Sequence, residues 1–133
     1  MENYVQVRPE HLNHYGYLFG GIMLKWVDEF AWLAAAMDFP GYTFVTVTMD
    51  KSLFKHRVEN GSILKFSITP VKIGNTSVSY NVVVNAVATK AENVSGNIEV
   101  FSTTVKFVAI DNSGKSIPLP KKIELKSGKF CDN

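Results

Sequence analysis

The sequence predicts an α+β domain in which a five-stranded antiparallel sheet wraps around one long central helix. A single stretch, near residues 20 to 37, has the length and apolar content of a long helix. The strand-like segments instead alternate apolar and polar residues and are rich in β-branched and aromatic types. The connections after the helix are short, and short connections join antiparallel strands.

The N-terminal part predicts one strand and then the helix. "YVQVR", residues 4–8, alternates apolar and polar residues, and Pro9 ends the strand. A loop rich in His, Asn, Tyr and Gly follows. The helical pattern then opens at Gly20-Gly21 and is not broken until "DFPG" at residues 38–41, where proline and glycine end it.

Four further strands are predicted after the helix. They are "YTFVTVTMDKSLF" (42–54), "SILKFSITPVKI" (62–73), "TSVSYNVVVNAVAT" (76–89) and "NIEVFSTTVKFVAID" (97–111). Turn-prone sequences separate or follow them: "VENGS", "IGNTS", "AENVSGN" and "DNSGKS". The order is therefore one strand, one helix and four strands.

The predicted helix is apolar on nearly every face, so it must be covered on nearly every side. A curved sheet wrapped around the helix covers most of it, and the sheet of a second copy would cover the rest. This arrangement is a hotdog fold with a homodimer as its minimal unit.

Bulk properties restrict the class of protein. The 133 residues suit one domain spanning residues 1–133, with a polar, flexible tail expected from about residue 121. A net charge of +2 does not indicate nucleic-acid binding. Charges inside the longest apolar stretch argue against a membrane span, and the N-terminus has no signal-type apolar segment. A cytoplasmic protein without a disulfide framework is expected, since Cys131 is its single cysteine.

The segment around the start of the helix resembles a known signature. "NHYGYLFGGIMLKWVDEFA" resembles the hotdog-fold acyl-CoA thioesterases of the bacterial YciA and mammalian cytosolic acyl-CoA hydrolase type, with matches at Asn13, Gly16, Phe19, Gly20, Gly21 and Asp28. The resemblance covers about residues 4 to 120. It implies an enzyme that hydrolyses acyl-CoA to a free carboxylic acid and coenzyme A, with no cofactor besides the coenzyme A of the substrate. The family usually has proline where this chain has Arg57.

Thioester hydrolysis needs a group that activates water or attacks the carbonyl, and Asp28 is the candidate. It could act as a general base or as a nucleophile that forms a mixed anhydride. Gly20 and Gly21 open the helix, where free N–H groups and the helix dipole could stabilise an oxyanion. Asp28 lies seven residues beyond Gly21, roughly 10 Å along the axis, which is too far to serve the same carbonyl.

A two-fold dimer removes that difficulty, with Asp28 of one subunit facing the Gly21 end of the other. The resemblance implies the same arrangement and puts Asn13 on the glycine side, where its amide would orient water or the thioester. In the resembled family a hexamer, as a trimer of dimers, is common.

Coenzyme A would need cationic and hydrogen-bonding groups. The predicted set is Thr46, on the strand after the helix, together with Phe54, Lys55, His56, Arg57, Gly74, Thr76 and Ser77; Lys72 offers a further positive charge.

Other interpretations remain open. Asp28 could be a structural group bonded to Lys25, although Lys25 is better placed to pair with Glu29. The three histidines have no spacing that suggests a metal site. An enoyl-thioester hydratase and a non-catalytic acyl-CoA-binding module are the alternative functions, and the sequence does not indicate an acyl chain length.

Overall fold

The computed structural model describes residues 1–88, 98–121 and 125–128, and it contains the predicted elements in the predicted order. The sheet has the strand order β1–β3–β4–β5–β2, and every neighbouring pair is antiparallel. The elements are β1 (Glu2–Gln6), the 3-10 helix η1 (Pro9–His11), α1 (Gly20–Asp38), β2 (Thr43–Phe54), β3 (Ile63–Ile73), β4 (Ser77–Ala88) and β5 (Ile98–Ile110).

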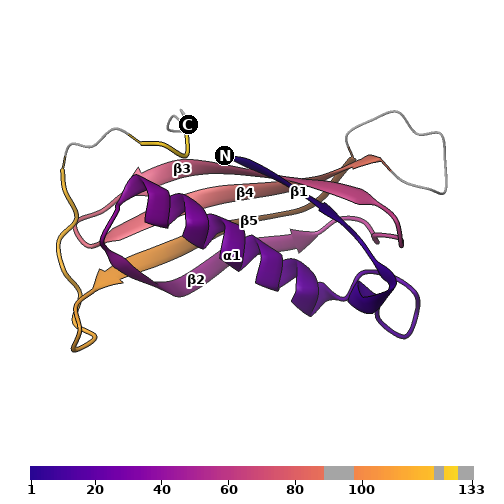
Figure 1. Cartoon of the computed structure of the whole chain (residues 1–133), viewed down its shortest axis with the longest axis horizontal. Helices are drawn as coiled ribbons and strands as arrows, with labels where there is room; N and C mark the ends of the chain where they lie inside the picture. Colours follow the sequence, from indigo (N-terminus) through magenta and orange to yellow (C-terminus); the bar gives the residue numbers. More distant parts are fainter. Residues whose placement is uncertain (89–97, 122–124, 129–133) are drawn as a thin grey trace.

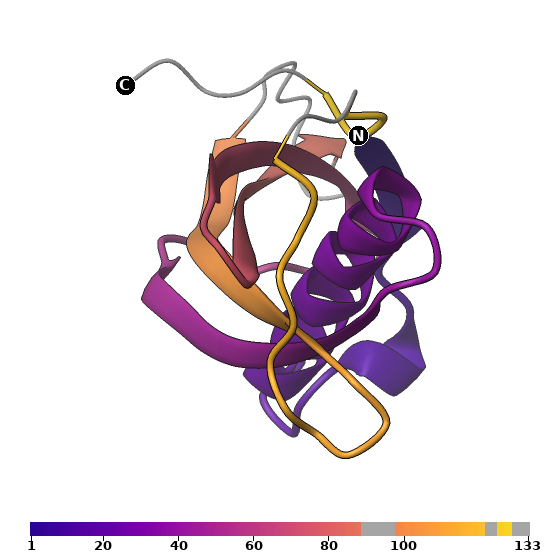
Figure 2. The same cartoon turned by 90° about the vertical axis from the view of Figure 1, so that its left-hand side faces the viewer.

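The sheet curves, and α1 lies along its concave side (Figures 1 and 2). Strand alternation explains this arrangement, because every second residue of β4 is buried while those between are half-exposed. Along α1, Val27, Ala31 and Ala34 are fully buried. The two alanines let the helix backbone approach the sheet closely. The core therefore lies between α1 and the concave face of β3, β4 and β5.

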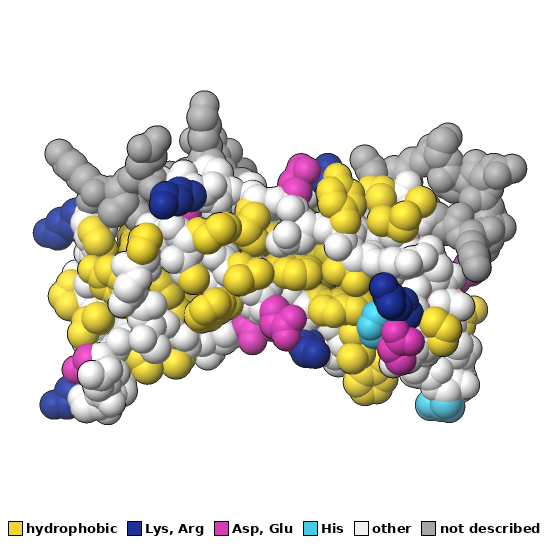
Figure 3. Space-filling view, in the orientation of Figure 1, with side chains coloured by type: hydrophobic (Ala, Val, Ile, Leu, Met, Phe, Trp, Pro, Cys, Tyr) yellow, Lys and Arg dark blue, Asp and Glu magenta, His cyan; other side chains and the backbone are white. Residues whose placement is uncertain are grey.

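Edge strand β2 leaves apolar side chains exposed. Its pattern has one buried residue in twelve, and the exposed large side chains are Val45, Val47, Leu53 and Phe54. On α1, Trp32, Leu33 and Met37 are each more than 40% exposed. Apolar side chains form a band along the face that carries α1 (Figure 3). One chain thus covers its helix incompletely, as expected for a fold in which a second copy covers the remaining face.

The pairing of β2 with β5 is regular only over the first part of the strand. The register shifts between Thr46 and Thr48 and again between Asp50 and Leu53, and Lys51 has a φ of 55° inside the second irregularity. A bulge of this kind bends an edge strand and interrupts its pairing.

Residues 125–128 of the C-terminal tail pack against the end of α1. Ser127 is 2% exposed, and its N–H and that of Lys126 both donate to Asp38 Oδ1 at 2.7 Å. Buried Tyr80 donates a hydrogen bond of 2.7 Å from its hydroxyl to Asp38 Oδ2. The Ser127 hydroxyl also donates to Asp38 Oδ2. Because a carboxylate can accept several donors, Asp38 holds the segment in place. Residues 122–124 and 129–133, including Cys131, lie outside the described residues.

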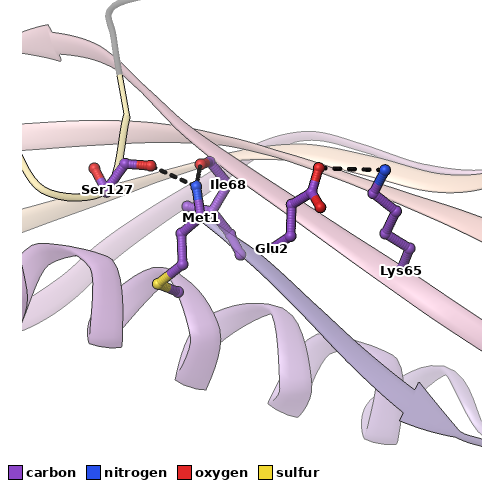
Figure 4. Close-up of polar contacts among 5 residues, drawn as sticks. All are labelled: Met1, Glu2, Lys65, Ile68 and Ser127. Atoms are coloured by element: carbon purple, nitrogen blue, oxygen red, sulfur yellow. Dashed lines mark hydrogen bonds and ion pairs between the residues drawn. The ribbon is translucent and has the colours of Figure 1, made fainter.

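The same segment also contacts the beginning of β1. The Met1 amino group donates to the carbonyl of Ile68 at 2.9 Å and to that of Ser127 (Figure 4). An ion pair of 3.2 Å joins Glu2 to Lys65 on β3. These contacts join β1, β3 and the described C-terminal residues.

The two ends of the sheet carry different connections. The start of α1 and the end of β2 lie together at one end, and the β3–β4 turn lies at the other end with the last turn of α1 (Figure 1). The predicted turn at residues 91–97 lies outside the described residues. In the described part of the chain, no helix combines the length and hydropathy needed to cross a membrane.

Candidate active site

Asp28 projects from the middle of α1 toward β2. Thr46 Oγ1 donates a hydrogen bond of 2.6 Å to Asp28 Oδ1. The structural partner considered for Asp28, Lys25, instead pairs with Glu29 at 3.9 Å, as the spacing of four residues predicts. Asp28 is half-exposed and Thr46 is exposed in the single chain. The carboxylate is therefore oriented by a neutral donor and keeps an open side.

The first turn of α1 offers free backbone donors. Phe19 is the N-cap residue and provides no side-chain cap, while the N–H groups of Ile22 and Met23 both donate to its carbonyl. The N–H groups of Gly20 and Gly21 are left without an acceptor among the described residues. Neither Asp nor Glu occurs in this turn, so an incoming oxyanion would meet no like charge there.

Gly21 is needed because the ring of Phe19 lies over it. A Cβ at residue 21 would lie 2.5 Å from Phe19 Cε1, whereas a Cβ at residue 20 would lie 3.6 Å from the ring of Phe54, an ordinary contact. Any side chain at residue 21 must displace the Phe19 ring. Gly21 therefore leaves room for the Phe19 ring, whereas a Cβ at residue 20 would meet no clash.

Asn13 holds the loop that precedes the helix. Its Oδ1 accepts hydrogen bonds from the N–H groups of Tyr15 and Tyr17 at 2.9 and 3.2 Å. Its backbone carbonyl accepts from Gly16, whose φ of +86° favours glycine. Because Oδ1 is used within the loop, an interaction of the Asn13 side chain with substrate has to come from the Nδ2 amino group.

A cleft of about 530 Å³ lies at this end of the molecule. The loop containing Asn13, the start of α1, the end of β2 with residues 55–58, and the start of β5 form its walls. The lining includes the predicted Asn13, Gly20, Phe54, Lys55, His56 and Arg57, and also Tyr15, Tyr17, Leu18, Met23, Val58 and Val100. The cleft therefore brings together six of the predicted residues from three separate segments.

The cations of the cleft are not equivalent. Lys55 forms an ion pair with Glu99, so its charge is partly balanced. The Arg57 guanidinium lies 5.1 Å from the centre of the Tyr17 ring, a cation–π contact, and it has no carboxylate partner among the described residues. Arg57, at the position where the resembled family usually has proline, is the better-placed cation for a phosphate.

Two predicted groups lie elsewhere in the chain. Gly74, Thr76 and Ser77 form the β3–β4 turn at the opposite end of the sheet, where the Gly74 N–H donates to the Ser77 carbonyl at 2.7 Å. Lys72 is close to the same turn. One chain does not bring these residues to the cleft, so their predicted role in binding coenzyme A requires a second chain.

Asp28 and Thr46 are also absent from the lining of the cleft. Asp28 instead borders a second hollow with Glu29, Trp32 and Leu33 on the outer face of α1. This separation agrees with the distance of roughly 10 Å along the helix axis between Gly21 and Asp28. A single chain holds both halves of the predicted chemistry, but on two different surfaces.

Residues 15–90 match the family model of the thioesterase superfamily. The chain belongs to the thioesterase superfamily. A hexameric hotdog-fold thioesterase of Campylobacter jejuni is similar in structure, with a TM-score of 0.80 and 32% identity, covering 90% of this chain and 89% of the other. The predicted hotdog fold is thereby confirmed.

Other relatives of this thioesterase-superfamily chain are more distant. An acyl-CoA hydrolase of Staphylococcus aureus, solved with butyryl coenzyme A and coenzyme A, is 25% identical with a TM-score of 0.73, covering 90% of this chain and 71% of the other. The uncharacterized acyl-CoA thioester hydrolase YkhA of Bacillus subtilis is 28% identical over 89% of this chain and 66% of its own length. The cytosolic acyl coenzyme A thioester hydrolase of Rattus norvegicus is 25% identical over 88% of this chain, which spans only 30% of that relative.

The sequence interpretation missed the tyrosines and apolar residues of the cleft. Tyr15 and Tyr17 lie inside the matched block, on either side of Gly16. This pattern could have indicated them as candidate residues of the site. Met23, Val58 and Val100 come from three elements and carry no local pattern. Only the folded chain brings them together.

Proposed function

We propose that this chain is an acyl-CoA thioesterase whose active site is completed by a second copy of the chain. One observation carries the proposal: Asp28, with its hydrogen-bonded carboxylate, and Gly20, at the uncapped end of the helix, belong to one matched block but line different hollows. Membership of the thioesterase superfamily supports the reaction, and relatives named as acyl-CoA hydrolases support the substrate class.

A homodimer is the smallest assembly that joins these two surfaces. Exposed apolar residues on α1 and β2 lie beside Asp28, and β2 is an edge strand whose backbone can pair with another strand. Two copies related by a two-fold axis would place Asp28 of each at the Gly21 end of the other. The hexameric Campylobacter jejuni neighbour supports a trimer of such dimers.

In the proposed reaction, the thioester carbonyl oxygen accepts hydrogen bonds from the N–H groups of Gly20 and Gly21. Asp28 of the second copy removes a proton from water as the water oxygen attacks the carbonyl carbon, and Thr46 holds the carboxylate in position. The C–S bond breaks, and the thiolate of coenzyme A receives the proton. Direct attack by Asp28, followed by hydrolysis of the anhydride, is the other route to the same products.

The remaining assignments concern binding. Asn13 Nδ2 would orient water or the thioester, and His56 and Arg57 would meet the phosphates of coenzyme A at the mouth of the cleft. Gly74, Thr76 and Ser77 would contribute from the second copy. The rat relative is called cytosolic, which supports a cytoplasmic location.

The test is thiol release from acetyl- to palmitoyl-CoA by the wild type and by Asp28→Ala. We expect the wild type to turn over and Asp28→Ala to lose activity about a hundredfold or more, as for loss of a general base. Glu29→Ala is the matched control, since this neighbouring carboxylate pairs with Lys25, and it should retain activity.

Each other outcome contradicts part of the proposal. Equal activity of the wild type and Asp28→Ala would make Asp28 structural. Binding of acyl-CoA without turnover would indicate a binding module, and loss of enoyl-CoA absorbance without thiol release would indicate a hydratase.

A further inference from the structure

We propose that the buried end of the Gly20 cleft receives the acyl chain and that Met23 sets the longest chain that fits. This inference rests on the proposed thioesterase function and adds a residue that determines substrate specificity. Met23 is 1% exposed, yet it borders the cleft beside Gly20.

The cleft changes character from its mouth to its floor. Tyr15 is 74% exposed, and Lys55, His56 and Arg57 are also exposed. The floor, in contrast, consists of Met23, Val58 and Val100, none more than 5% exposed. An acyl-CoA molecule has the same polarity, with charged phosphates at one end and an alkyl chain at the other.

The helix end fixes how such a molecule would lie. If the thioester carbonyl binds at the N–H groups of Gly20 and Gly21, the two arms of the substrate leave it in different directions. Phosphates are favoured near the cations of the mouth, whereas each methylene buried in an apolar site improves binding about fourfold. The alkyl arm therefore points to the floor.

Of the three floor residues, Met23 has the side chain that can change position most easily. The other two floor residues, Val58 and Val100, are held by backbone hydrogen bonds. Leu18 N–H donates to the Val58 carbonyl at 2.8 Å, and Lys55 N–H donates to the Val100 carbonyl at 2.9 Å. Met23 lies three residues after Gly20, on the same side of the helix, and its flexible side chain separates the cleft from the core. The length of the residue at position 23 should therefore limit the length of the acyl chain.

The experiment measures kcat/KM against acyl chain length, from acetyl- to palmitoyl-CoA, for the wild type and three variants. Met23→Ala should move the optimum to chains longer by about two carbons, raising the ratio of long-chain to short-chain kcat/KM by roughly tenfold or more. Met23→Phe should move the optimum to shorter chains, and Met23→Leu, of similar volume, should stay near the wild type.

Ile68→Ala is the control for lost stability, because Ile68 is fully buried in β3 and does not line the cleft. It should lower stability without changing the chain-length profile. If Met23→Ala does not fold, the shift to shorter chains in Met23→Phe still decides the question.

Two results would overturn the inference and are distinguishable. Active variants with the wild-type profile would exclude Met23 as the limit while leaving the thioesterase function intact. Absence of thiol release by the wild type from every acyl-CoA would remove the proposed function and this inference with it.

Discussion

The hydroxyl of Thr46 holds the carboxylate of Asp28, so one hydrogen bond of 2.6 Å orients the proposed base. The carboxylate can rotate freely about its terminal torsion unless a donor selects one position. Thr46 on edge strand β2 supplies that donor. The position of β2 therefore affects the orientation of the proposed base on α1.

Removal of this hydroxyl should lower turnover. We expect Thr46→Val, which keeps the shape of the side chain, to reduce kcat about tenfold or more with a smaller change in KM, because a misoriented base loses catalytic efficiency. Thr46→Ser keeps the hydroxyl and should restore most of the activity. Equal kcat for the valine and serine variants would show that the hydrogen bond has no role in orientation.

Tyr80 links stability to pH through a buried hydroxyl. Burial, followed by the hydrogen bond to Asp38, raises the pKa of Tyr80 well above its ordinary value. Above about pH 10 the unfolded chain releases this proton while the folded chain keeps it, so stability falls as pH rises, by up to about 1.4 kcal/mol per pH unit.

Tyr80→Phe should remove this pH dependence and lower stability at neutral pH by about 1 to 3 kcal/mol, since Asp38 loses a donor. Urea unfolding between pH 7 and pH 11 measures both effects. An identical alkaline slope in the wild type and the variant would mean that Tyr80 does not carry the linkage.

At the scale of elements, the start of α1 combines an uncapped helix end with two glycines. Gly21→Val would place a side chain over the N–H groups and displace the Phe19 ring, since even a Cβ would lie 2.5 Å from it. We expect kcat to fall on the order of a hundredfold or more, as for loss of an oxyanion donor.

The double variant Phe19→Ala with Gly21→Val separates the two causes. It removes the clash with the ring but leaves the valine over the donors, so activity should stay low. Recovery of activity in the double variant would show that the ring, and not access to the helix end, limits Gly21→Val.

The boundaries of these elements followed from local chemistry. The glycine pair and "DFPG" indicated α1 to within about a residue, and alternation indicated the four later strands equally well, because helix ends and strand faces depend on neighbouring residues. The first strand was predicted two residues too late, since it occupies Glu2–Gln6 and not residues 4–8. The candidate residues Asn13, Gly20, Gly21 and Asp28 stood in one recognisable block.

Long-range contacts were not predictable in the same way. The hydrogen bonds from residues 126 and 127 to Asp38 span more than 80 residues, and no local pattern marks them. The apolar floor of the cleft depends likewise on Val58 and Val100 meeting α1. Tertiary packing decides such contacts.

At the scale of the whole molecule, one chain leaves the proposed catalytic groups apart and its apolar face open. Asp28 borders the hollow beside Trp32 and Leu33, whereas Gly20 borders the cleft. The exposed side chains of α1 and β2 would be buried in an obligate dimer. The proposed dimer would therefore bury the apolar face and also bring the proposed catalytic groups together.

Complementation between two inactive variants tests the shared site most directly. Asp28→Ala and Gly21→Val are mixed, subunit exchange is confirmed with different affinity tags, and thiol release is measured. A dimer with one of each has one intact site, so activity should recover to about a quarter of the wild-type value after random exchange. The control mixes Asp28→Ala with the Asp28→Ala, Gly21→Val double variant, which forms no intact site. No recovery above this control after complete exchange would contradict a site shared between two copies.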